Sequence, residues 1–351
     1  MKDITVVIVN WNSGSLLADC LQHLALQTIQ PKKIVVIDNF SSDDSIALIE
    51  NFKHVEILQM QTNLGFAAAN NYVLQQCTTE FIALLNPDAF PAPNWLEKLL
   101  AAATTYPESA SFGSRQIRHD NTQLLDGIGD SYHMSGLVWR AGFGAQNQEH
   151  CLKPCEIFSP CAAAALYRTK VLQELGGFDE DFFCYVEDID LGFRLRLAGH
   201  KSYYVPEACV RHIGSATTGG SGSDFSVYHG HRNLIYAYIK NMPGILFWLL
   251  LPLHLLLNLV TIAVFTRRGQ CKLILRAKRD ALFGIPHAWR KRQQVQSTRV
   301  ATISEIWRVL DKQFLPKRRP TVNTVPVRVV SRQLPRQSPR QSPQYSSKME
   351  S

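Results

Sequence analysis

The sequence lacks both of the glycine signatures that mark the commonest nucleotide-binding enzymes. Neither G-x-G-x-x-G nor G-x-x-x-x-G-K-[S/T] occurs in its 351 residues, which argues against a dinucleotide-dependent oxidoreductase and against a P-loop NTPase. It also lacks any C-x-x-C pair, although it contains eight cysteines. Cys20 and Cys77 stand among apolar residues at helical spacing, so we expect reduced, buried thiols there. Cys151 and Cys155 have no second pair with which to complete a metal site.

Acidic residues are scarce in the C-terminal part. Residues 267–351 contain 20 Lys+Arg and 4 Asp+Glu, whereas residues 1–266 contain 17 and 25. The formal net charge of +8 is therefore a property of the C-terminal part alone. Such a charge favours an anionic partner, either a membrane surface or a nucleic acid. For roughly the last thirty residues, a merely solvated tail is the alternative.

Charged residues are absent altogether between residues 241 and 266. This run is long enough to cross a hydrocarbon core of about 30 Å, but Pro252, His254 and Asn258 interrupt it. The apolar run at residues 4–9 is short and strand-like and does not resemble a signal peptide, so we expect the N-terminal part in the cytosol. A single crossing would then carry Arg267 and the basic residues after it outside, against the positive-inside rule. We expect a helix in the membrane interface or a hairpin bent at Pro252, with a true span or a buried soluble helix pair as alternatives.

The N-terminal part alternates short β-branched runs with helical patterns, and the length suits one large α/β domain with appendages. Strands are expected over residues 4–9, 34–37, 55–60 and 81–85. Helices are expected over residues 16–24 and from Ser41 or Ser42 to Phe52. This alternation predicts a doubly wound, mostly parallel sheet of the Rossmann-like type. Residues 110–160 are glycine-rich and are expected to form an irregular insertion.

Polar residues follow each of these strands, at the sheet edge where open α/β folds bind ligands. Gly65 and three alanines bring backbone close to a partner at a helix start, and an anion such as a diphosphate is the natural candidate. Asp38 ends the second strand and can accept hydrogen bonds from a base or ribose, with a turn-stabilising role as the alternative. Asp88, two residues past the fourth strand, suits a divalent metal bound to a nucleotide diphosphate.

A cluster of acids begins a helix that runs from Asp188 to a glycine stop at Gly199. Glu187 and Asp188 stand behind the aromatic residues Phe182, Phe183 and Tyr185. A pair of acids in a partly shielded cleft suits a catalytic base, and a capped surface helix is the alternative. The segment 214–223, GSATTGGSGS, is expected to form a mobile flap.

Six motifs in this order resemble family 2 glycosyltransferases over residues 3–240: VIVNWNSG, DNFSSD, NLGFAAANN, LLNPDA, GGFDEDFFCYVEDIDLGFRLRLAG and VRH. They are most similar to the bacterial rhamnosyltransferase-like branch that builds cell-surface polysaccharide. The resemblance implies a GT-A fold and an inverting transfer to a glycan or lipid-linked acceptor at the cytoplasmic face of the inner membrane. It implies dTDP-rhamnose as donor, with a UDP-hexose or UDP-GlcNAc as the alternative, and no nucleic-acid partner.

The resemblance also implies roles for individual residues. Asp188 would be the general base, with Glu187 beside it on the acceptor side. Asp88 would be the surviving acid of the D-x-D motif, and His212 the second protein ligand of Mg²⁺ or Mn²⁺. Cys161 stands where relatives commonly have glycine. The nucleotide site would be formed by Asn10, Trp11, Asn12, Asp38, Asn63, Gly65, Asn70 and Asn86, the last in place of the first Asp of the motif.

Two other functions compete with this interpretation. A processive polysaccharide synthase would carry a Q-x-x-R-W element, which the sequence lacks. A non-catalytic nucleotide-sugar-binding scaffold would not need Asp88, Asp188 and His212 together. The expected organisation is a GT-A catalytic domain over residues 1–240, a hydrophobic membrane-associated segment with a basic flank over 241–280, an amphipathic helical region over 281–316 and a disordered basic tail over 317–351.

Overall fold

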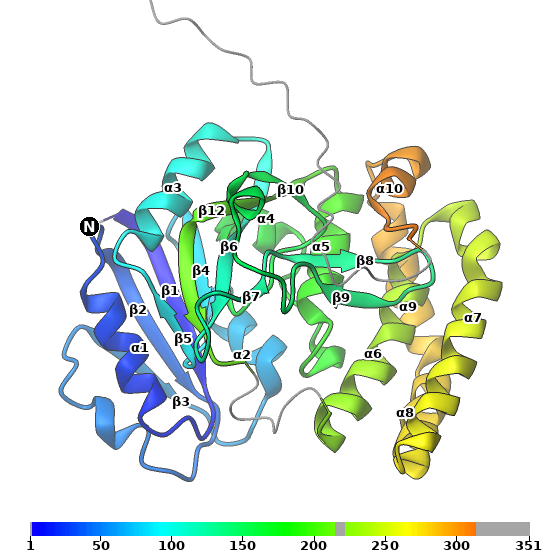
Figure 1. Cartoon of the computed structure of the whole chain (residues 1–351), viewed down its shortest axis with the longest axis horizontal. Coiled ribbons are helices and arrows are strands. Elements are labelled where there is room, and N and C mark those ends of the chain that lie inside the picture. Colours follow the sequence, from blue (N-terminus) through cyan, green and yellow to red (C-terminus); the bar gives the residue numbers. More distant parts are fainter. Residues whose placement is uncertain (1, 215–221, 314–351) are drawn as a thin grey trace, which may run out of the picture.

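A ten-stranded mixed sheet forms the centre of the N-terminal part in the computed structural model, which describes residues 2–214 and 222–313 (Figure 1). The strand order is β10-β12-β6-β11-β4-β1-β2-β3, with β5 paired to β12 and β7 paired to β6. Strands β4, β1, β2 and β3 are parallel to one another, β12 is parallel to β6, and β11 is antiparallel to both of its neighbours. The bounds are β1 Lys2–Asn10, β2 Pro31–Asp38, β3 Val55–Gln59, β4 Phe81–Leu85, β5 Ala89–Pro91, β6 Ser109–Arg118, β7 Leu125–Gly127, β10 Cys155–Ile157, β11 Ala164–Arg168 and β12 Lys201–His212.

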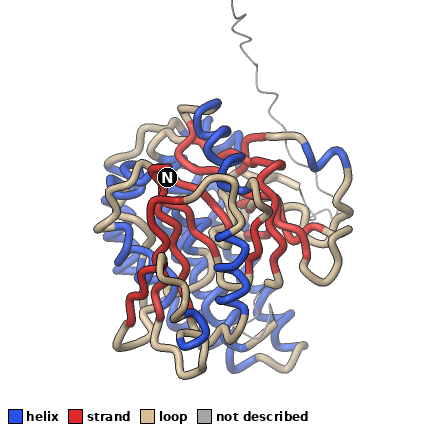
Figure 2. Tube along the Cα trace, turned by 90° about the vertical axis from the view of Figure 1, so that its left-hand side faces the viewer, coloured by secondary structure: helices blue, strands red, loops and turns tan. Residues whose placement is uncertain are grey.

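Helices cover both faces of this sheet because the side chains of a strand alternate between its faces. Val6 and Ile8 of β1 pack in one core with α1 (Leu16–Ala25) and α3 (Trp95–Thr105). Val7 packs in a second core with α2 (Gly65–Leu74), α4 (Thr169–Glu174) and α5 (Glu187–Leu197). Figure 2 shows the strands side by side between these helices. The predicted doubly wound α/β fold is thereby confirmed.

A layer of five helices stands beside the sheet domain, on the side away from α1 (Figure 1). It contains α6 Asp224–Asn241, α7 Gly244–Arg267, α8 Cys271–Phe283, α9 Ile285–Ser297 and α10 Ile303–Val309. Helix α5 joins the two parts, because its Leu191 and Leu195 face the sheet while Ile189 and Phe193 pack with α6 and α7. A small antiparallel ribbon, β8 Asp130–Tyr132 and β9 Val138–Arg140, lies at this junction.

Two expectations about local structure are wrong. The segment after Ser42 forms only a single 3-10 turn, η1 (Ala47–Ile49), instead of a helix to Phe52. There the Asp43 carboxylate accepts hydrogen bonds from the backbone N–H of Gly14 and from Ser45, which fixes a loop in place of a helix start. The start of the glycine-rich region is also regular, since β6 lies in the centre of the sheet. Residues 215–221 of the expected flap and the whole 317–351 tail lie outside the described residues.

Candidate active site

Asp88 and His212 meet because β5 pairs antiparallel with the end of β12. In this register His212 lies opposite Ala89, and the backbone N–H of Ile213 donates to the Asp88 carbonyl at 3.1 Å. The side chains of Asp88 and His212 are both buried, and His212 Nε2 lies 3.3 Å from Asp88 Oδ1. Residues 124 positions apart in the chain thus form one polar pair at the carboxyl end of β4, where the sequence places the ligand site.

Asp126 of β7 fixes the orientation of the His212 ring. His212 Nδ1 lies 2.8 Å from Asp126 Oδ2, so Nε2 faces Asp88. Burial alone would lower the pKa of His212, but Asp126 and Asp88 outweigh burial and raise the pKa to about 9. The two carboxylates therefore favour a positive charge between them, which is the condition that a cation site requires.

Arg140 of β9 connects this pair to a second group of acids. Its guanidinium lies 2.7 Å from Asp126 and 3.9 Å from Asp130, and it donates to Cys161 Sγ at 2.8 Å. Ligand atoms of Asp130, Cys161 and Asp188 lie within 4.8 Å of one another. Because the Arg140 guanidinium already supplies positive charge beside them, we interpret this group as an arginine-centred cluster and not as a metal site.

Asp188 lies in the first turn of α5 at the edge of this cluster. Its carboxylate accepts a hydrogen bond from the backbone N–H of Ala162 at 3.3 Å. The carbonyl of the next residue, Ala163, accepts from the backbone N–H of Asn86 at the end of β4. Burial raises the pKa of Asp188, while Arg140 and the backbone donors oppose the rise. Burial and the neighbouring Asp188 raise the pKa of Glu187 well above its usual range, and Glu187 Oε2 makes no hydrogen bond to any residue that the structure describes. Asp188 is therefore the acid of this pair that is better placed to carry negative charge.

The loop that leads into α5 is strained. Phe183, Tyr185 and Val186 all have positive φ values, of 62°, 68° and 71°, a conformation that costs non-glycine residues about 1–3 kcal/mol each. Asn233 of α6 holds this loop, since its Nδ2 donates to the carbonyls of Phe182, Cys184 and Tyr185 at 2.8, 3.0 and 2.8 Å. Helix α6 thus fixes the backbone that positions Glu187 and Asp188.

Gly65 makes a close approach at the start of α2, as expected, but its partner is protein. The Phe183 carbonyl accepts the N–H groups of Phe66 and Ala67 at 2.7 and 3.3 Å. With φ at +79°, a Cβ on Gly65 would lie 2.5 Å from the Phe183 ring. The helix start expected to receive a diphosphate instead receives a carbonyl of the strained loop.

Most of the other predicted nucleotide-binding residues lie at or just past the carboxyl ends of β1, β2 and β4, whereas Asn63 precedes α2 and Asn70 lies within it. Asn10 is fully buried and its amide donates to Asp38 at 3.0 Å, which fixes that carboxylate. Trp11 and Asn12 follow on the rim, and Asn12 accepts the N–H of Ser42. Asn63 accepts from Asn39 and from the N–H of Gly65, whereas Asn70 is buried and donates to Phe66 one turn earlier.

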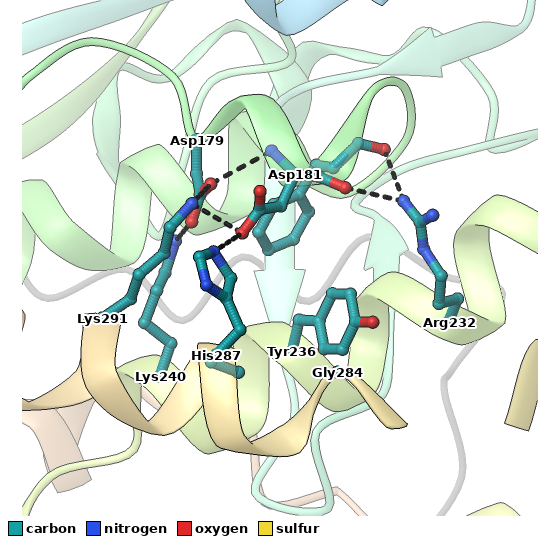
Figure 3. Close-up of a pocket in the computed structure, with 10 residues that line it drawn as sticks. Asp179, Asp181, Arg232, Tyr236, Lys240, Gly284, His287 and Lys291 are labelled. Carbon is teal, nitrogen blue, oxygen red and sulfur yellow. Dashed lines mark hydrogen bonds and ion pairs between the residues drawn. The ribbon is translucent and has the colours of Figure 1, made fainter. Parts of the chain in front are cut away.

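A cavity of about 250 Å³ lies where α6 and α9 meet the segment before α5 (Figure 3). Lys291 and His287 lie 2.6 and 2.8 Å from the Asp181 carboxylate, and Lys240 pairs with Asp179. Burial acts to raise the pKa of Asp179, but Lys240 and Lys291 hold it far below its usual range. Since the acids and cations of this cavity pair with each other, we interpret the cluster as the ionic attachment of the helical layer to the segment before α5, which we call the base loop (residues 179–186) after the role proposed below for Asp188.

The structure therefore joins Asp88, His212 and Asp188 through residues that sequence reasoning did not identify: Asp126, Asp130, Arg140 and Asn233. A local signal existed for the first two. Both flank the tight G-I-G turn, and a Cβ on Gly127 would lie 2.3 Å from the Arg140 side chain. Asn233 offered no signal, because its partners are backbone carbonyls about fifty residues away.

Comparison with known proteins identifies the family of this site. The family model described as glycosyl transferase family 2 matches residues 5–176, and that described as glycosyl transferase family group 2 matches residues 150–267. The chain belongs to glycosyl transferase family 2. This result confirms the family that the six motifs predict, and it makes the chain a glycosyltransferase.

The curated relatives of this transferase include enzymes named for rhamnose transfer. The N-acetylglucosaminyl-diphospho-decaprenol L-rhamnosyltransferase of Mycobacterium tuberculosis is 28% identical over 260 residues, which cover 67% of this chain and 84% of the relative. The O-antigen chain rhamnosyltransferase RfbN of Salmonella typhimurium is 29% identical over 60% of this chain and 66% of its own length.

Two solved structures share the GT-A fold of the transferase. The mannosyltransferase PcManGT from Pyrobaculum calidifontis, in complex with GDP-Man and Mn²⁺, has a TM-score of 0.52 at 14% identity and covers 87% of both chains. GalNAc-T7 with UDP, GalNAc and Mn²⁺ has a TM-score of 0.55 at 19% identity and covers 68% of this chain and 47% of its own. At these identities the likeness establishes the fold alone.

Replacing Asn233 by Ala tests whether α6 positions Asp188, the candidate base. The substitution removes the amide donor from three carbonyls of the loop, and of these Phe182 still accepts from Arg232 and from the N–H of Cys184. We therefore expect a loss of about 1–3 kcal/mol in the free energy of unfolding. Release of the strained loop should lower kcat about a hundredfold through misplacement of Asp188. Urea unfolding and the transfer rate measure the two effects. The matched control is Gln296→Ala in α9, which removes an amide donor to the backbone carbonyls of Lys240 and Asn241, also on α6. Equal kcat values in the two variants would contradict the positioning role.

Proposed function

We propose that this glycosyltransferase moves a sugar from a nucleotide sugar to a glycan or lipid-linked acceptor, with inversion, at the cytoplasmic face of the inner membrane. One observation carries the proposal. Polar contacts run from Asp88 through His212, Asp126 and Arg140 to Asp130 and Cys161, whose ligand atoms lie within 4.8 Å of the Asp188 carboxylate. A site for a cation and a base for an alcohol thereby belong to one cluster, as a one-step transfer requires.

Asp188 is the proposed general base. An acceptor hydroxyl becomes a competent nucleophile when a positioned carboxylate takes its proton, an effect of about 10²–10⁴ in rate. Asp188 accepts backbone N–H groups and lies near Arg140, which favour its charged form over that of Glu187. Glu187, whose pKa is raised further, is proposed to face the acceptor as a neutral hydrogen-bonding group. Attack from the side opposite the leaving group then inverts the anomeric centre.

Asp88 and His212 are proposed to hold Mg²⁺ or Mn²⁺, as the D-x-D resemblance implies. The residues fit such an ion, because the buried His212 Nε2 has no hydrogen-bond partner within the described part of the chain and lies 3.3 Å from an Asp88 carboxylate oxygen. A carboxylate with an imidazole suits Mn²⁺ somewhat better than Mg²⁺. When bound, the ion supplies positive charge for the departing nucleoside diphosphate. Asn86 in the first position of the motif offers an amide oxygen without a charge.

The donor is proposed to lie across the ends of β1, β2 and β4. Asp38 and Trp11 would bind the base, and Asn10 keeps the Asp38 carboxylate in place. The names of the relatives support L-rhamnose as the sugar and a lipid diphosphate as the acceptor carrier. We therefore propose dTDP-rhamnose as donor, with a UDP-hexose or UDP-GlcNAc as the alternative.

Asp188→Asn should abolish transfer, with a fall of about 10²–10⁴ in kcat, while nucleotide affinity measured by calorimetry stays near that of the wild type. Glu187→Gln is the matched control, because glutamine has the shape of the neutral acid, and we expect a much smaller fall. Transfer by Asp188→Asn at the wild-type rate would remove Asp188 from the role of base.

As the pH is lowered, kcat should fall at a pH above the usual pKa range of an aspartate. A base acts when it is deprotonated, and burial raises the pKa of Asp188. Arg140→Met removes a charge that lowers this pKa, so the acidic limb of the kcat profile should move to higher pH by about 1 unit. Arg118→Met, at an exposed ion pair, is the control and should leave the limb in place. An acidic limb that stays at the same pH in Arg140→Met would argue against an effect of Arg140 on the pKa of Asp188.

Removal of divalent cations by a chelator should abolish transfer, and added Mn²⁺ or Mg²⁺ should restore it. Asp126→Asn should raise the Mn²⁺ concentration needed for half-maximal rate by about 10–100-fold, since His212 loses its orienting carboxylate. Asp120→Asn, on the surface, serves as the control. Full activity in excess chelator would refute the metal proposal.

A further inference from the structure

Helix α7 presents a continuous apolar stripe to the outside of the molecule. Between Ile245 and Val264 the exposed positions recur every three or four residues over about five turns, and all of them are apolar: Ile245, Trp248, Leu249, Pro252, Leu255, Leu256, Leu259, Val260, Ala263 and Val264. A soluble protein places polar residues on such a face. Among the described residues, one helix has the length and the apolar composition to cross a membrane, and it is α7.

The opposite face of α7 is attached to the protein along its whole length. Near the start, Phe247 lies against Trp289 and its carbonyl accepts from Tyr238. In the middle, His254 stacks on Tyr238 with ring centroids 4.0 Å apart and its Nδ1 lies 2.8 Å from the Ser135 carbonyl. Near the end, Phe265 packs on His231 of α6.

This attachment excludes a span in the observed arrangement. If α7 crossed the membrane, α6 would enter the hydrocarbon core beside it. Lys240 of α6 and the loop carbonyls bonded to Asn233 would then lie at membrane depth, where charged side chains and irregular backbone are unfavourable. Pro252 does not fold the segment into a hairpin, because α7 continues through it to Arg267. The helix is about 36 Å long at 1.5 Å per residue, so its whole exposed stripe can touch a flat surface only if the helix lies parallel to that surface.

Helix α8 continues this face with a different composition. Its exposed positions combine basic and large apolar residues: Lys272, Leu275, Arg276, Arg279, Leu282 and Phe283. Phe283 is 77% exposed. Between residues 267 and 299 the chain has ten Lys or Arg and one acid, Asp280. Figure 1 shows α7 and α8 side by side at the edge of the molecule farthest from α1, and the two helices pack together through Phe265 and Ile274.

We propose that α7 and α8 form a docking surface that lies flat in the interface of an anionic bilayer, with the apolar stripe inserted among the acyl chains and the basic residues among the headgroups. The charge selects this occupant over a second copy of the chain. Two copies joined through this face would bring like charges together, whereas anionic lipid complements them. An interfacial helix of this kind buries its apolar side about 5–10 Å below the headgroups.

The docking surface also explains how the active site reaches a lipid-linked acceptor. Helix α6 packs under α7 and α8, through Phe265, Ile274 and Val227, and carries Asn233 toward the base loop. The membrane contact is therefore one helix away from the backbone that positions Asp188. The inference deepens the proposed membrane location and rests on it.

The first test is flotation of the full chain with vesicles of phosphatidylcholine containing about 30% phosphatidylglycerol. Leu259→Glu should lower the bound fraction about tenfold or more, since it places a charge among acyl chains. Leu26→Glu is the matched control, because Leu26 and Leu259 are each 65% exposed and Leu26 lies on the far side of the sheet domain. Arg276→Glu should weaken binding to anionic vesicles, and its effect should shrink at high salt. Equal binding by Leu259→Glu and wild type would overturn the docking surface.

The second test separates a flat helix from a spanning one by brominated-lipid quenching of added tryptophans. Leu256→Trp in the middle of α7 and Val264→Trp near its end should both be quenched most by bromines close to the headgroups. Strongest quenching of Leu256→Trp by bromines near the chain ends would overturn the flat arrangement. Lipid-free gel filtration checks the other occupant, and a dimer that Leu259→Glu abolishes, together with absent vesicle binding, would also overturn the proposal.

Transfer assays distinguish this inference from the proposed function. Leu259→Glu should keep transfer to a water-soluble acceptor fragment and lose at least about tenfold with a lipid-linked acceptor in vesicles. Transfer to vesicle-borne acceptor that is unchanged in Leu259→Glu would count against the docking surface. Absence of transfer in every variant, with vesicle binding intact, would overturn the proposed function and still support the docking surface.

Discussion

The site depends on the ion pairs of the half-buried guanidinium of Arg140. The guanidinium stands between Asp126, which faces the proposed metal ligands, and Asp130, which faces the base. Two buried carboxylates and a neighbouring Asp188 would repel one another without a cation among them, and an unpaired buried charge costs several kcal/mol. Burial and Asp188 already raise the pKa of Asp130 well above its usual range. The β8–β9 ribbon, a minor element by size, therefore holds the two halves of the site at a fixed separation.

The same network separates the protonation states that the proposed inverting transfer would need. Around His212 two carboxylates favour positive charge, while around Asp188 burial acts against negative charge and Arg140 restores it. Opposite tendencies at the two ends of one chain of contacts are typical of sites in which environment assigns the roles of acid and base. The positive φ values of Phe183, Tyr185 and Val186 fit this interpretation. A loop that is held in a strained backbone conformation keeps Asp188 in one orientation.

Much of the fold could be predicted from the sequence, and the reason is local. Parallel strands buried on both faces are continuous apolar runs, so β1, β2 and β4 stand out, and the polar residues after them mark the ligand edge. Motif order supplied Asp88, His212 and Asp188. The connecting residues Asp126 and Arg140 could not be found this way, since their meeting depends on strand pairing between segments with weak periodicity of their own. The missing helix before Phe52 has the same cause, because the Asp43 contact with Gly14 joins two loops.

Helix α6 contacts both the proposed docking surface and the loop that leads to the proposed base. One side packs with α7 and α8, and the other places Asn233 under the loop and Lys240 against Asp179 and Asp190. Asp190 is fully buried in α5, two residues past the proposed base. Any displacement of the helical layer must therefore either break these buried contacts, at a cost of several kcal/mol, or move the base with it. A surface that fixes the layer against a bilayer thus also fixes the height of the base above the lipid, which suits an enzyme whose acceptor is proposed to carry its reactive hydroxyl just outside the headgroups.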